Sequence, residues 1–164
     1  GRESVPTDPD REWARQLFAT ITQGQTTDEA RFVALNYAIH DHIVHPPVHP
    51  GPMTPREIWE KQLGWCHDVT HLFVYLAKAG GYDARPLQLI HTDGVNGHFV
   101  PEVFYDGKWH VFGPDHGKVY RLPDGTVASY EDLLKDNTPV RIVPDPWKGE
   151  NGEGMEGFYV QRLH

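Results

Sequence analysis

The sequence predicts an α+β domain in which N-terminal helices pack on a mainly antiparallel sheet. In the first half of the chain, apolar residues recur at intervals of three and four, the period of a helix with one buried face. After Gly80-Gly81 they alternate instead, and glycine-containing turn signals separate the runs, as in strands joined by hairpins. Because helices and strands are segregated along the chain, this fold class is favoured over a doubly wound parallel sheet.

Four helices are expected before Gly81, at about 11–21, 28–44, 55–62 and 65–79. Thr27 precedes the second helix as a capping residue, and the five prolines between positions 46 and 55 predict a rigid connector after it. Pro55 occupies the first position of the third helix, where proline is favoured. The fourth helix is apolar over nearly one whole side, so we expect it at the centre of the domain.

The second half predicts strands at about 84–90, 98–105, 108–112, 119–122, 126–128 and 139–144. Asp106-Gly107 is a hairpin signal, and Ser129 caps a short helix that ends near Leu134. The Gly- and Glu-rich segment 145–157 is expected to be irregular, and 158–160 to dock back on the domain. With no repeat or boundary in the pattern, residues 1–164 are expected to form one domain.

Composition excludes several classes of protein. The net charge of −8 and the absence of a Lys/Arg run argue against a nucleic-acid partner. No apolar run reaches the roughly 20 residues of a membrane span, and a lone cysteine, Cys66, precludes an intrachain disulfide. A chain that begins at Gly1 without a hydrophobic leader shows no targeting peptide. Location in the cytoplasm and export after signal removal both stay open, as does the oligomeric state.

Cys66 is the first candidate for chemistry. A thiol in the first turn of a helix faces the positive end of the macrodipole and unpaired backbone N–H groups, which favour the thiolate and can hold an oxyanion. Gly64 permits a sharp entry to this helix. A thiolate catalyst also needs a base and an acceptor that orients the base, and His98 and Asp115 are the candidates. Each residue also fits a plain role: a buried cysteine, a loop histidine and a turn-capping aspartate.

An ordered set of short motifs resembles the transglutaminase-like superfamily, which shares the papain-like arrangement. The set comprises Gly64-Trp65-Cys66 at a helix start, Gly80-Gly81 before Ala84-Arg85, His98 to Val103 with Glu102, and Gly107-Lys108-Trp109. The resemblance covers about residues 28–117, and we expect the core at about 28–122. It implies a Cys-His-Asp triad formed by Cys66, His98 and an acid near 113–115.

One departure from the family pattern concerns that acid. The family Asp follows the strand Trp by four residues and precedes Pro, whereas this chain has Gly113 before Pro114, and Asp115 is displaced by two. The loop could bend so that Asp115 still reaches His98, another acceptor could orient the imidazole, or the triad could be degenerate. Loss of the orienting acid would weaken catalysis without abolishing it.

Polar and aromatic residues near Cys66 are candidates for contact with substrate. Trp65 would line the cleft, and His67 and His71 lie one turn apart on one helix face. Glu102, from the histidine strand, completes this set. The alternative is a solvated polar face and ordinary aromatic packing.

The 11 histidines also raise a metal hypothesis. His42 and His45 share a face, but His40 points well away, and His49 follows in the connector, so spacing alone does not give the three or four converging ligands of a zinc site. Another set could draw on His91, His110 and His116 beside Cys66 or His98. The leading expectation includes neither metal nor cofactor.

Three functions follow, in order of preference. The first is thiol-dependent acyl transfer, chiefly hydrolysis of an amide or peptide bond by Cys66, His98 and Asp115. The second is a catalytically degenerate module of the same fold that binds a glycan or a peptide. The third is a metal-dependent protein that uses the clustered histidines. The expected partners are peptide, protein or glycan-type substrates.

Overall fold

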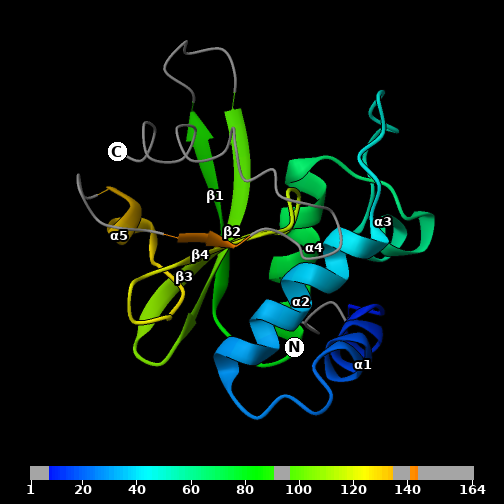
Figure 1. The fold of residues 1–164 in the computed structure, drawn as a ribbon. Coiled ribbons are helices and arrows are strands. Elements are labelled where there is room, and N and C mark those ends of the chain that lie inside the picture. The colour runs from blue at the N-terminus through cyan, green and yellow to red at the C-terminus, as the bar shows by residue number, and fades with distance from the viewer. Residues whose placement is uncertain (1–7, 91–96, 135–140, 144–164) are drawn as a thin grey trace, which may run out of the picture.

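A computed structural model describes residues 8–90, 97–134 and 141–143, in which the helices and the strands are segregated along the chain (Figure 1). In chain order the elements are α1 (Arg11–Ile21), α2 (Asp28–His42), α3 (Pro55–Lys61), α4 (Cys66–Ala79), β1 (Ala84–Ile90), β2 (Gly97–Tyr105), β3 (Lys108–Gly113), β4 (Lys118–Arg121), α5 (Tyr130–Leu134) and β5 (Arg141–Val143). The predicted α+β class is confirmed.

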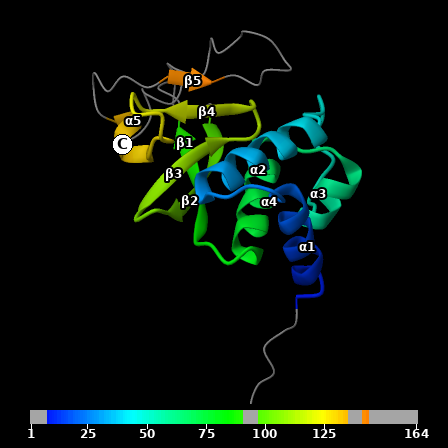
Figure 2. The ribbon, with the colours of Figure 1, turned by 60° about the horizontal axis from the view of Figure 1, so that its bottom comes forward.

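The five strands form one sheet in their sequence order, and every neighbouring pair is antiparallel. The register places Leu89 opposite His98 and Glu102 opposite Val111. The β2–β3 hairpin turns through Asp106 and Gly107, both at positive φ, as the Asp-Gly signal predicts. Figure 2 shows the helices α1 to α4 on one side of this sheet and α5 near its far side.

Helix α4 occupies the centre of the domain, as its sequence predicts (Figure 1). It packs on β1 and β2, while α1, α2 and α3 pack on its other sides. Leu72, Phe73 and Leu76 are fully buried on it, because an apolar helix gains about 1.5–3 kcal/mol for each large side chain removed from water. The central position explains why one helix carries so many apolar residues.

Two buried clusters form the core. The larger lies between the helices and the sheet, where Phe73 contacts Phe112 with ring centroids 5.5 Å apart. The smaller contains Leu89, Val111 and Leu133, and thus joins the sheet to α5. The sheet is therefore covered on both faces.

Several element boundaries differ from prediction for local reasons. The second helix ends at His42 because Ile43 is extended and Val44 pairs with Leu63. The strand predicted at 126–128 is wrong, since Val127 makes only an isolated bridge with Arg121. The segments 145–157 and 158–160 lie outside the described residues.

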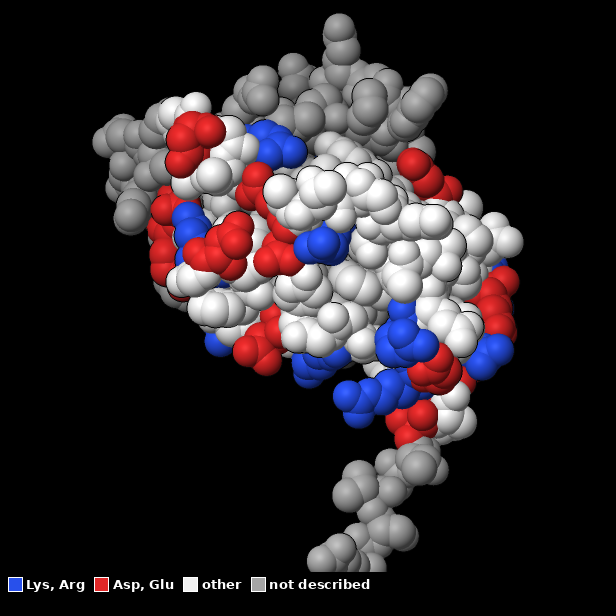
Figure 3. Space-filling view, turned by 90° about the horizontal axis from the view of Figure 1, so that it is seen from below, with Lys and Arg blue, Asp and Glu red and all other residues white. Residues whose placement is uncertain are grey.

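Among the helices in the described part of the chain, none has both the length and the apolar character that a membrane span requires. The face in Figure 3 carries acidic and basic side chains interspersed with broad uncharged areas.

Candidate active site

Three residues from separate elements meet at the start of α4. Cys66 is the first residue of that helix, His98 the second residue of β2, and Asp115 lies in the turn between β3 and β4. The Cys66 thiol, an imidazole nitrogen of His98 and a carboxylate oxygen of Asp115 all lie within 4.8 Å of one another. The turn thus brings Asp115 to the other two residues despite its displacement along the sequence.

The turn that carries Asp115 is held by α2. His40 lies with Nδ1 3.1 Å from the carbonyl oxygen of Pro114, and a carbonyl only accepts, so the ring nitrogen donates. Gly117 has a φ of +62°, and a Cβ there would lie 2.4 Å from Cδ2 of His40. Glycine therefore allows both the left-handed turn and the close approach of the imidazole.

Local sequence also sets the first turn of α4. Trp65 is the N-cap residue, and its backbone N–H donates to Oδ2 of Asp68 at 2.8 Å. A Cβ at Gly64 would lie 2.8 Å from Cβ of Asp68, so this approach requires glycine. The backbone N–H groups of the first turn have no carbonyl acceptor within the helix, and that of Cys66 can serve an oxyanion.

The thiol itself is held in its protonated form. Burial raises the pKa of Cys66, the backbone N–H groups of Phe99 and His67 oppose this, and the carboxylates of Asp115 and Asp68 add to the rise. The expectation that the helix start would favour the thiolate is therefore wrong in net effect. Desolvation exceeds the favourable contribution of the helix N-terminus.

His98 is neutral at neutral pH. It is 5% exposed, and burial lowers its pKa to about 4, with nearby His116 adding to the fall and Asp115 opposing it. A neutral imidazole beside a protonated thiol has a lone pair available for the thiol proton. The resting pair is thus neutral rather than an ion pair.

Further imidazoles surround the Asp115 carboxylate. His45 Nδ1 lies 3.4 Å from Oδ1 and His116 Nε2 lies 3.4 Å from Oδ2, while only 8% of the Asp115 side chain is exposed. The rings of His98 and His116 are 5.0 Å apart. The acid is therefore enclosed by histidines from three different segments.

Of the other residues predicted to contact substrate, Trp65 and His67 lie near Cys66, whereas His71 borders a separate cavity. Trp65 stands next to Cys66, with its indole N–H donating to the carbonyl of Pro46, and His67 is partly exposed beside Phe99. His71 is exposed and borders a cavity of 410 Å³.

Glu102 makes its contact elsewhere, with Arg85. It is 1% exposed, and its carboxylate pairs with Arg85, whose guanidinium lies 4.0 Å from the centre of the Trp109 ring. The structure does not bring Glu102 to Cys66.

The histidines considered as metal ligands do not converge as one set. His40 bonds to Pro114, His42 lies 2.8 Å from the carbonyl of Trp59, and His45 faces Asp115. His110 is buried with its ring stacked on Tyr105, and His91 lies outside the described residues.

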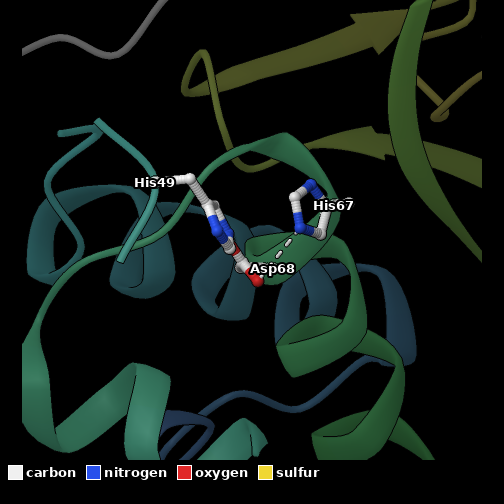
Figure 4. Close-up of side chains that lie close together, drawn as sticks. All are labelled: His49, His67 and Asp68. Atoms are coloured by element: carbon white, nitrogen blue, oxygen red, sulfur yellow. Dashed lines mark hydrogen bonds and ion pairs between the residues drawn. The ribbon is translucent and has the colours of Figure 1, made fainter. Parts of the chain in front are cut away.

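In the described ranges, two donor sets are close enough for an ion: Cys66 with His98 and Asp115, and His49 with His67 and Asp68 (Figure 4).

The pairing of Asp68 with His49 was not among the contacts predicted from the sequence. The position of Asp68 three residues after the N-cap is a capping signal that could have been recognised. The pairing with His49 joins residues 19 positions apart and has no local signal.

The family model described as the transglutaminase-like superfamily matches residues 15–114, more than half of the chain. A search of curated proteins finds no relative that matches.

Two solved structures share the fold. A "putative cysteine protease" from Cytophaga hutchinsonii has 16% identity and a TM-score of 0.59 over 87% of this chain and 55% of its own. A "putative protease" from Parabacteroides distasonis ATCC 8503 has 11% identity and a TM-score of 0.51 over 62% of this chain and 23% of its own. The chain thus spans about half of the first protein and about a quarter of the second. By the extent of the family match, this chain belongs to the transglutaminase-like superfamily.

Proposed function

We propose that the domain catalyses thiol-dependent acyl transfer, with hydrolysis of an amide or peptide bond as the reaction. The observation that carries this proposal is the meeting of Cys66, His98 and Asp115 within 4.8 Å at the start of α4. A nucleophile, a neutral base and an acid that orients the base are the parts that such a reaction needs. The "putative cysteine protease" from Cytophaga hutchinsonii, which shares the fold, supports the choice of hydrolysis.

The first half of the reaction forms an acyl-enzyme. His98 takes the proton from Sγ of Cys66 as the sulfur attacks the substrate carbonyl carbon, and the carbonyl electrons move to oxygen. Backbone N–H groups of the first turn of α4 stabilise that oxyanion. The imidazolium returns its proton to the leaving amine as the C–N bond breaks, which leaves a thioester.

Water completes the cycle. His98 removes a proton from a water molecule as the water oxygen attacks the thioester carbonyl. The C–S bond then breaks, which releases the carboxylic acid, and the Cys66 thiolate regains the proton from His98. Asp115 orients the imidazole and stabilises the imidazolium, which matters because burial makes His98 a weak base. An amine in place of water would give transamidation by the same steps.

The test uses an activated ester as a general acyl donor. Acylation should place one acyl group on Cys66, identified by peptide mass mapping, and none on the Cys66→Ser variant under the same conditions. His98→Ala should slow acylation by about 100-fold or more. An adduct at other residues only, or equal rates in wild type and His98→Ala, would overturn the proposal.

One observation favours a second candidate, a non-catalytic module that binds a peptide or glycan at the same site. The protonated thiol and the neutral, weakly basic imidazole leave the site without a preformed thiolate. In that case the folded protein would bind peptide or glycan without forming any acyl adduct, and His98→Ala would leave binding unchanged.

A further inference from the structure

The tautomer of His49 is set by its surroundings. The backbone N–H of Gly51 donates to Nδ1 of His49 at 3.1 Å, so this nitrogen carries a lone pair. In the neutral ring the proton then lies on Nε2, 2.8 Å from Oδ2 of Asp68. His49 is therefore a donor to the carboxylate. Figure 4 shows the His49 ring beside the Asp68 side chain.

Asp68 accepts this bond at the entry to the nucleophile helix. The same oxygen takes the backbone N–H of Trp65 at 2.8 Å, and the Asp68 side chain is only 6% exposed. The Trp65 indole in turn donates to the carbonyl of Pro46, and His49 packs edge-on against that indole at 5.0 Å. The connector is thus tied at two points to the residue that precedes Cys66.

The same side chains form a candidate metal set, since donor atoms of His49, His67 and Asp68 lie within 4.8 Å of one another. Two imidazoles and a carboxylate suit several transition metals. A metal on Nε2 of His49 would, however, require the ring proton on Nδ1, where the Gly51 N–H already points. The positive end of α4 also repels a cation at this position.

We propose that His49 is a positioning residue for Cys66: its hydrogen bond to Asp68 clamps the connector onto the first turn of α4, and the dipole of its N–H group offsets part of the field of that carboxylate at the thiol. The reaction served is the one proposed above. The role of His49 is tested by the reactivity of the Cys66 thiol, which requires no turnover of substrate. Failure of this proposal can therefore be distinguished from failure of the acyl-transfer proposal.

Glutamine at position 49 separates hydrogen bonding from metal ligation. In His49→Gln, the amide Nε2 can donate to Asp68 while Oε1 accepts from Gly51 N–H, but a neutral amide is a poor transition-metal ligand. His49→Ala removes both hydrogen bonds. His42→Ala is the matched control, because His42 also hydrogen-bonds through Nε2 and also contacts a tryptophan ring, that of Trp59, but has no described contact with Asp68.

The rate of Cys66 alkylation by iodoacetamide at neutral pH is the readout, measured beside the free energy of unfolding. His49→Ala should slow alkylation by about threefold to tenfold, because Asp68 loses a donor and its charge disfavours the neighbouring thiolate more strongly. His49→Gln should restore the wild-type rate. His42→Ala should lower stability yet leave the rate unchanged.

A second measurement reads the tautomer directly. Long-range ¹H–¹⁵N spectra of histidine-labelled protein, assigned with His49→Gln, should show His49 protonated at Nε2. The proposal is overturned by an Nδ1–H tautomer, by equal alkylation rates in wild type and His49→Ala, or by a His49→Gln rate as slow as that of His49→Ala. Stoichiometric metal in the wild type that His49→Gln loses would also overturn it and assign a metal centre.

Discussion

His40 donates a hydrogen bond from Nδ1 to the carbonyl oxygen of Pro114 over 3.1 Å, across 74 positions of sequence. This bond ties the C-terminal end of α2 to the turn that presents Asp115. The same imidazole fills the space that a side chain at Gly117 would need. The position of the proposed acid thus depends on a helix that is distant in the sequence but adjacent in space.

Gly117→Ala should displace this turn. Its Cβ would lie 2.4 Å from the His40 ring at a φ of +62°, so backbone strain and steric overlap both oppose it. We expect a loss of about 1–3 kcal/mol in the free energy of unfolding and a fall in acyl transfer of about tenfold or more. Urea denaturation and the acylation assay measure the two effects.

Gly107→Ala is the control for backbone strain alone. Gly107 also has a positive φ, of +77°, but a Cβ there has no neighbour within 4 Å. It should cost about 1 kcal/mol and leave acylation unchanged. Equal behaviour of the two variants would show that the contact with His40 does not position Asp115.

Asp115→Asn should change two rates in opposite directions. The Asp115 charge raises the pKa of Cys66, so its removal should lower that pKa and speed alkylation of the thiol at neutral pH. Acyl transfer should instead fall by about 10²- to 10⁴-fold, because the imidazolium of His98 loses its counter-charge. A fall in both rates would indicate a general disruption of the site rather than the proposed role.

Stability should decrease as the pH falls from 6.5 toward about 4, because burial lowers the pKa of His98 to about 4 from an ordinary 6.5. Between these values the unfolded chain binds a proton that the folded protein does not, so protons favour unfolding, by up to about 1.4 kcal/mol per pH unit. Urea denaturation at neutral pH and at about pH 5 should show a smaller loss in His98→Gln than in wild type. Some slope should remain, since burial also lowers the pKa values of His110 and His116. Identical slopes would contradict the assignment to His98.

Gly64→Ala should disturb the entry to α4. Its Cβ would approach Cβ of Asp68 to 2.8 Å and Cγ2 of Ile58 to 3.4 Å, and a helix Cβ cannot swing aside. We expect a cost of about 1–3 kcal/mol in the free energy of unfolding and a changed rate of Cys66 alkylation. If both quantities match the wild type, the first turn of α4 is not fixed by this contact.

Much of the fold was predictable because its signals are local. Helix α1 and strand β1 have the predicted bounds, and α4 begins one residue later than predicted because Trp65 acts as its cap. The strand predicted at 126–128 was wrong because its signal is not local. Alternation of apolar residues does not decide whether a partner strand is present.

Periodicity and turn chemistry act over a few residues, so the sequence alone predicted the helix that presents Cys66, the strand that presents His98 and an antiparallel sheet joined by hairpins. It could not decide whether Asp115 reaches them, since that depends on His40 and Gly117 packing across the domain. Nor could it give the protonation of the thiol, because the helix start is local but burial is a property of the whole fold. The pairing of His49 with Asp68 likewise arises only when the connector folds back over α4.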